Sequence, residues 1–127
     1  MNRSDDWIKQ AERDLDFAKE TISKGYYEWT CFVCQQSAEK AVKALYYKLN
    51  LEPWGHSISK LLEEIKDNIK IQDEIIEIAK FLDKFYIPTR YPNGFSEGFP
   101  GLYYTKDEAL NAIDACEKVI STIKELL

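Results

Sequence analysis

The sequence has little histidine, methionine, proline or glycine, and it contains no long hydrophobic run. One His, one Met, four Pro and five Gly occur among 127 residues. The single His, His56, leaves one candidate for imidazole chemistry. No apolar stretch approaches the roughly 18 residues of a membrane span, so we expect a soluble protein without a membrane partner. Three Cys, an odd number, suit a reducing compartment better than a disulfide scaffold, and we expect a cytoplasmic protein.

Charge and length narrow the functional classes further. Seventeen Lys and Arg stand against 22 Asp and Glu, which gives a net charge of -5. The overall charge therefore does not favour bulk attraction to a polyanion, and only a local basic patch would serve that purpose. Apolar residues make up 45% and charged residues 31%, as in ordinary globular proteins. The length predicts one domain over residues 1–127.

Apolar residues recur with helical periodicity along nearly the whole chain. The stripes predict helices over approximately residues 4–24, 27–49, 58–65, 71–86 and 105–127. Ser4 and Ser57 are predicted N-caps, and Thr105 with Glu108 forms a predicted capping box. No alternating pattern typical of strands occurs. The fold class is therefore predicted to be all-α, a five-helix bundle.

The segment 87–104, between the last two predicted helices, is rich in Pro, Gly and aromatic residues. Loops longer than about 12–15 residues are uncommon in compact domains and tend to be functional or mobile. Arg90 stands between two prolines here and is flanked by Tyr86 and Tyr91. A guanidinium binds phosphate in two-point geometry, and aromatic faces stack on bases. The alternative, which the sequence supports equally, is a structural Arg that bonds carbonyls at a helix end.

The cysteines raise the question of a metal or redox site. Cys31 and Cys34 have Cys-x-x-Cys spacing, and a zinc site can be drawn from them with Cys116 and His56. Each Cys, however, falls on an apolar helical stripe as a small core residue, and a second closely spaced pair of ligands is missing. We expect no metal and no cofactor.

Two other polar residues have structural and functional interpretations. Asp14 lies on the inward side of the first predicted helix, where a carboxylate needs a partner. We expect it to pair with a Lys, Arg, Tyr or Trp of a neighbouring helix rather than to act as a site acid. His56 precedes the Ser57 cap, and a loop His packed near a helix start is favoured over a catalytic one.

Three segments together resemble the HEPN (higher eukaryotes and prokaryotes nucleotide-binding) domain family. They are AERDL at 11–15, FVCQQSAEKAVKAL at 32–45 and LDKFYIPTRYP at 82–92. His56 followed by Leu61 is similar to the start of the family's third helix. The resemblance implies an up-and-down bundle, similar to the helical C-terminal domain of nucleotidyltransferases, that forms a homodimer. It also implies a toxin–antitoxin-like pairing with a minimal nucleotidyltransferase, or a metal-independent endoribonuclease in which a His follows an Arg after four to six residues.

The sequence departs from that ribonuclease pattern, because no His follows Arg90. The resemblance therefore favours a non-catalytic protein that binds a nucleotide or nucleic acid and acts as partner of a minimal nucleotidyltransferase. Arg90 would contact phosphate, Tyr91 and Tyr86 would stack, and Lys40 and Lys43 would add positive charge. One alternative is an RNA-cleaving toxin in which His56 or Tyr91 replaces the missing His. A second alternative is a pure protein-interaction subunit.

Overall fold

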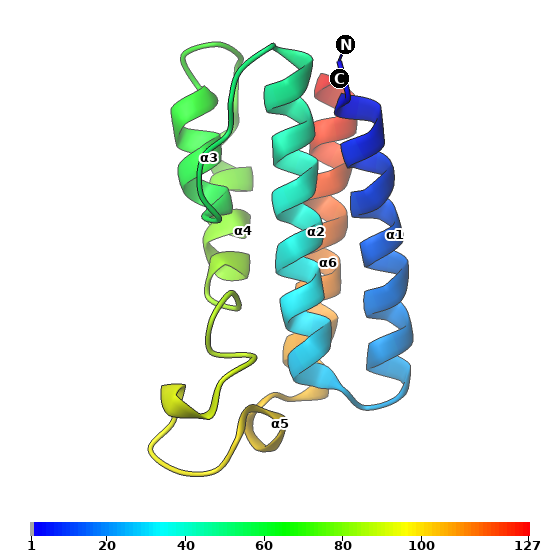
Figure 1. The fold of residues 1–127 in the computed structure, drawn as a ribbon, viewed down its shortest axis with the longest axis vertical. Coiled ribbons are helices and arrows are strands. Elements are labelled where there is room, and N and C mark those ends of the chain that lie inside the picture. The colour runs from blue at the N-terminus through cyan, green and yellow to red at the C-terminus, as the bar shows by residue number, and fades with distance from the viewer. Residues whose placement is uncertain (1) are drawn as a thin grey trace.

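A computed structural model describes residues 2–127 and is helical, as predicted (Figure 1). The elements are α1 (Ser4–Ser23), α2 (Tyr27–Lys48), α3 (Ile58–Ile65), α4 (Asp73–Asp83), η1 (Pro92–Gly94, a 3₁₀ turn), α5 (Pro100–Tyr103) and α6 (Lys106–Leu126). The five predicted helices correspond to α1, α2, α3, α4 and α6. The predicted loop 87–104 additionally contains η1 and the single turn α5. None of the helices within 2–127 is long and apolar enough to cross a bilayer.

The long helices α1, α2 and α6 lie side by side, and the shorter α3 and α4 complete the bundle beside α2 (Figure 1). Helices α1, α2, α4 and α6 alternate in direction. The start of α1 and the end of α6 lie at the same end of the bundle (Figure 1). The segment with η1 and α5 lies at the opposite end, below α2 and α4. That end therefore gathers the aromatic residues of the 87–104 segment.

The connection between α2 and α3 runs back along α2, so these two helices are parallel. Gln35 Nε2, in the middle of α2, donates a hydrogen bond of 3.0 Å to the carbonyl of His56, just before α3. Tyr46 Oη, about three turns later in α2, donates a hydrogen bond of 2.6 Å to the carbonyl of Leu61. The returning segment thus brings His56 beside the middle of α2 instead of leaving it at the far end of the bundle.

Small residues allow α1 and α2 to pack closely. Ala11 and Ala18 of α1 and Ala38 and Ala41 of α2 are fully buried. Ser37 Oγ donates 2.6 Å to the carbonyl of Ala11 across this contact. Such a short side-chain-to-backbone bond requires the backbones of α1 and α2 to approach closely.

The predicted caps at Ser57 and Thr105 are confirmed, whereas the predicted cap at Ser4 is wrong, because Ser4 is the first residue of α1 and the N-cap position is Arg3. Ser57 Oγ accepts a hydrogen bond from the backbone N–H of Lys60 at the start of α3. At the start of α6, Thr105 accepts from the Glu108 N–H while the Glu108 carboxylate accepts from the Thr105 N–H. The fourth helix ends at Asp83 rather than near residue 86, because residues 84–90 form successive tight turns.

Candidate functional site

Arg90 follows a tight turn at the end of α4 that holds its side chain against the backbone. The fully buried Thr89 anchors this turn through a 2.7 Å hydrogen bond from Oγ1 to the carbonyl of Phe85. Arg90 donates from Nε (3.0 Å) and Nη2 (2.6 Å) to the carbonyl of Tyr86. A guanidinium has five N–H donors, so those of Nη1 and one of Nη2 are left for another acceptor. Arg90 therefore has the structural role that the sequence supports as an alternative, and it also keeps free donors.

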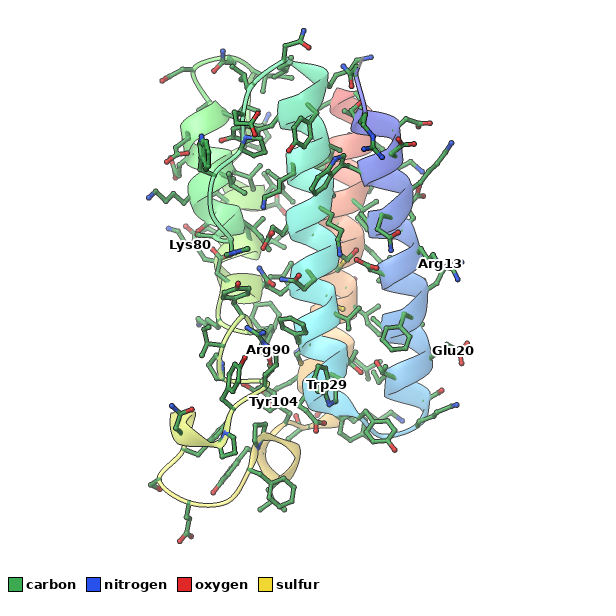
Figure 2. The ribbon with its side chains drawn as sticks, in the orientation of Figure 1. Arg13, Glu20, Trp29, Lys80, Arg90 and Tyr104 are labelled. Carbon is green, nitrogen blue, oxygen red and sulfur yellow. The ribbon has the colours of Figure 1, made fainter. Side chains whose placement is uncertain are left out.

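Three aromatic rings surround the same guanidinium. Its Cζ lies 4.3 Å from the ring centroid of Phe32, 5.0 Å from that of Tyr86 and 5.1 Å from that of Tyr91. In Figure 2 Arg90 lies next to α2, near the end of the bundle marked by Trp29 and Tyr104. No carboxylate within residues 2–127 forms an ion pair with Arg90, which is half-buried. The site thus holds a fixed cation whose charge is not neutralised by an acid.

His56 packs on the same tyrosine. Its ring stacks on that of Tyr86, with a centroid distance of 4.7 Å and an interplanar angle of 18°. Its Nδ1 lies 3.2 Å from both carboxylate oxygens of Glu39. The His56 side chain is 55% exposed, whereas that of Glu39 is 8% exposed. The structure therefore brings His56 and Arg90, which are 34 residues apart in the sequence, to one aromatic ring.

The buried carboxylate of Glu39 has further partners on its own helix. Lys43 Nζ lies 3.0 Å from Oε2, and Gln35 Nε2 donates to Oε1 at 3.3 Å. These three side chains are spaced four residues apart on α2, so they share one face of the helix. Lys43 therefore forms an ion pair with Glu39, and the Glu39 carboxylate in turn contacts His56.

Asp83 connects the two chain segments that carry His56 and Tyr86. Its carboxylate accepts hydrogen bonds from the backbone N–H groups of Ile58 (2.7 Å) and Ser59 (3.1 Å). It also accepts from the hydroxyls of Ser57 (3.0 Å) and Ser59 (2.6 Å). A carboxylate at a helix N-terminus complements the free N–H groups and the helix dipole. Asp83 thereby fixes the start of α3 to the end of α4.

The predicted site residues divide into two groups. Tyr86, Arg90, Tyr91 and His56 lie together, and Lys43 joins them through Glu39, as described above. Lys40 instead pairs with Asp14 of α1 at 2.5 Å. Gln10 Nε2 also donates to Asp14, at 2.8 Å. The expectation that Asp14 pairs with a residue of a neighbouring helix is confirmed, and Lys40 is its partner.

Sequence reasoning did not select Phe32 and Glu39 as site residues, although both lie within the segment that resembles the family. Phe32 provides the ring closest to the Arg90 guanidinium. The signal that was available for Glu39 is the four-residue spacing from Gln35 and to Lys43. That spacing predicts that the three side chains share one face of the helix. It does not predict that the segment before α3, which carries His56, packs on this face.

The three cysteines are free thiols in the core. Burial raises the pKa of the Cys31 thiol to about 12. A hydrogen bond with Cys116, together with burial, raises the pKa of Cys34 as well. Within residues 2–127 no group of three or more His, Cys, Asp and Glu side chains has an arrangement that would hold a metal ion.

Comparisons with known proteins agree with this fold. The family profile described as HEPN domain matches residues 4–126. The Methanocaldococcus jannaschii protein named "Putative toxin MJ1304" is 30% identical over 130 residues, which cover 95% of this chain and 86% of that protein. The chain therefore belongs to the HEPN domain family.

Solved structures are similar over nearly the full length. The crystal structure of TT1696 from Thermus thermophilus is 40% identical, with a TM-score of 0.96 and coverage of 100% of both chains. The structure of ST0689, an archaeal HEPN homologue, is 45% identical, with a TM-score of 0.84 and coverage of 99% of this chain and 98% of that one. A HEPN domain protein of Thermotoga maritima is 32% identical, with a TM-score of 0.78 and coverage of 94% and 95%.

Proposed function

We propose that this HEPN protein binds a phosphate group of a nucleotide or nucleic acid at Arg90, without catalysing a reaction on it. The observation that carries the proposal is the guanidinium itself: it is fixed by the Tyr86 carbonyl and has no acidic partner in the described chain, yet it retains free donors. A pre-positioned guanidinium loses little side-chain entropy on binding and suits the two-point geometry of a phosphate.

The tyrosines around Arg90 favour a ligand that carries a base as well as a phosphate. Tyr91 is 47% exposed, and its ring lies against the Arg90 guanidinium. An exposed ring beside a phosphate-binding cation offers a stacking surface for a base. The His56 ring covers one face of the Tyr86 ring, so that face is not available for stacking on a base.

We propose that the active form is a homodimer joined at the end of the bundle near Arg90. Large apolar side chains are exposed there, and we call them the end surface: Tyr26, Trp29, Ile87, Tyr91, Phe99, Leu102 and Tyr103. Exposed apolar patches on a protein surface mark interaction sites. Two copies that met at the end surface would bring two Arg90 side chains to one groove. A minimal nucleotidyltransferase as a further partner rests on the family resemblance.

Affinity measurements on a charge-neutralised pair of variants test the phosphate site. Arg90→Gln should weaken binding of a labelled single-stranded RNA by about 10- to 100-fold, because a hydrogen-bonded charged contact contributes about 1.5–3 kcal/mol. Arg13→Gln removes the same charge from the outer face of α1 (Figure 2) and should change affinity less than about threefold. Equal affinities of wild type and Arg90→Gln would remove Arg90 from the site.

Oligomeric state and partner binding are tested separately by light scattering. Leu102→Glu, in the end surface, should convert a dimer to a monomer, whereas Trp54→Glu, in the segment between α2 and α3, should leave the mass unchanged. Co-expression with a small nucleotidyltransferase should then yield a complex of higher mass than the homodimer. A monomeric wild type would contradict the dimer, and separate elution of the two proteins would contradict the partnership.

RNA cleavage is a second candidate function, favoured by the position of His56. His56 and Arg90 both pack on Tyr86, so a potential acid–base group lies near a phosphate-binding cation. The name of the Methanocaldococcus jannaschii relative, "Putative toxin MJ1304", is consistent with this candidate. Incubation of structured RNA with the protein in EDTA decides between the two functions. Cleavage that is lost in both Arg90→Ala and His56→Ala would establish the enzyme, and intact RNA would support binding alone.

A further inference from the structure

We propose that the groove between α4 and α6 is a docking site for a basic amphipathic helix of a partner protein. Two adjoining hollows lie between these helices, and because they share Glu74, Ile78, Asp114 and Lys118 they form one continuous groove. In Figure 1, α6 lies behind α2 and packs against α4. The residues that surround Arg90 do not line this groove, so a partner bound there would leave the proposed phosphate site open.

The floor of the groove is apolar. Ile78 and Phe81 of α4 are partly exposed there, and Ala115 of α6 adds a small apolar side chain. The groove extends over residues 72–81 and 111–125. At about 1.5 Å per helical residue, these spans are about 14 and 21 Å long. A helix of about 10–14 residues therefore has the right length to pack between α4 and α6.

The rim of the groove is acidic. Five carboxylates and one ammonium group line it: Glu74, Glu77, Asp114, Glu117, Glu125 and Lys118. Lys118 is already paired with Asp114, at 3.2 Å. Glu77 pairs with Lys80 at 3.1 Å, and Glu117 pairs with Lys19 at 3.5 Å. The cations beside the groove are therefore occupied by three of its carboxylates.

The other two carboxylates are not neutralised. Glu74 and Glu125 are exposed, and no ion pair within residues 2–127 includes either of them. Glu74 belongs to α4 and Glu125 to α6, and both line the same hollow. Both walls of the groove thus present negative charge above an apolar floor.

This charge determines which occupant fits. The carboxylates repel a nucleic acid or an anionic lipid surface. A second copy of this chain, bound groove to groove about a two-fold axis, would bring Glu74 and Glu125 of both copies into one interface. A helix with apolar residues at every third or fourth position and Lys or Arg beside them satisfies both requirements. Its apolar face would contact Ile78 and Phe81 while its cations reached the carboxylates.

Binding of designed peptides tests the inference. The probe is a fluorescein-labelled peptide of about 14 Leu and Lys residues, with all Leu on one helical face. One comparison peptide has Glu in place of Lys, and another has the same Leu and Lys content in scrambled order. Anisotropy is measured with the folded protein at about 0.15 M salt. The amphipathic basic peptide should bind saturably and at least about tenfold more tightly than either comparison peptide, because only it matches both floor and rim.

Charge-neutralised variants locate the bound peptide. Glu74→Gln combined with Glu125→Gln should weaken binding about three- to tenfold, because two exposed charge contacts are lost. The control combines Glu20→Gln in α1 with Glu64→Gln in α3, two exposed residues outside the groove that form no ion pair within residues 2–127. This control removes the same charge and should change affinity less than about twofold.

Three results would overturn the inference: no saturable binding of the amphipathic basic peptide, equal binding of the scrambled peptide, or equal weakening by the two pairs of substitutions. Arg90→Gln should not weaken peptide binding, because Arg90 lies outside the groove. A failure of the docking site would leave the phosphate site in place, since RNA binding is measured separately.

Discussion

Removal of the Asp83 carboxylate should destabilise the fold more than any surface substitution of the same type. Asp83 accepts four hydrogen bonds at the start of α3, two from backbone N–H groups and two from hydroxyls. The backbone N–H of Ile58 is the most critical donor, because Ile58 is fully buried and water cannot replace the lost acceptor. The hydroxyls of Ser57 and Ser59 are partly buried and recover part of their hydrogen bonding from solvent.

The magnitude follows from two contributions. Loss of a capping side chain costs about 1 kcal/mol. A buried donor left without an acceptor costs about 1–3 kcal/mol, and this applies to the N–H of Ile58. Asp83→Ala should therefore lower the free energy of unfolding by about 2–4 kcal/mol, which corresponds to a decrease in Tm of roughly 10 °C for a domain of this size.

Urea denaturation followed by circular dichroism measures this change. Asp73→Asn is a suitable control, because the Asp73 side chain is 92% exposed and pairs with Lys66 on the surface. Exposed ion pairs contribute 0–1 kcal/mol, so the control should remain close to wild type. An Asp83→Ala protein within about 0.5 kcal/mol of wild type would refute the proposal that Asp83 joins α3 to α4.

Three other substitutions address the core. Leu45→Ala, at a fully buried position, should cost about 2–5 kcal/mol in urea denaturation because it leaves a cavity. Ser37→Ala removes the donor to the Ala11 carbonyl between α1 and α2 and should cost about 1 kcal/mol by the same assay. Burial raises the pKa of Cys31 from 9.0 to about 12, so the unfolded chain releases this proton first as pH rises. The stability due to this thiol is complete below pH 9 and is lost between pH 9 and 12, by about 1.4 kcal/mol at pH 10. Cys31→Ala should flatten that decline, and an equal decline in both proteins would contradict it.

Much of the fold follows from local signals in the sequence. Helix formation and the caps at Ser57 and Thr105 depend on residues that are close in sequence. The pairing of Asp14 follows from the cost of burying an unpaired charge. Periodicity and capping therefore located the five main helices. The end of the fourth helix was misplaced, because Leu82 and Tyr86 share a helical spacing even though the chain turns at Asp83.

The candidate site depends on contacts that periodicity does not encode. The parallel arrangement of α2 and α3 is set by hydrogen bonds from Gln35 and Tyr46 to a segment that returns along the bundle. Only this return brings His56 to Glu39 and Tyr86. The sequence predicts a loop His packed near a helix start, whereas the contact of His56 with the buried Glu39 depends on the tertiary structure.

A crystal structure of the protein with a bound single-stranded RNA tests the central claim most directly. The phosphate site predicts a phosphate oxygen within hydrogen-bond distance of Nη1 of Arg90, with a base against Tyr91. RNA bound at another surface, with the Arg90 guanidinium contacted only by its own Tyr86 carbonyl, would contradict it.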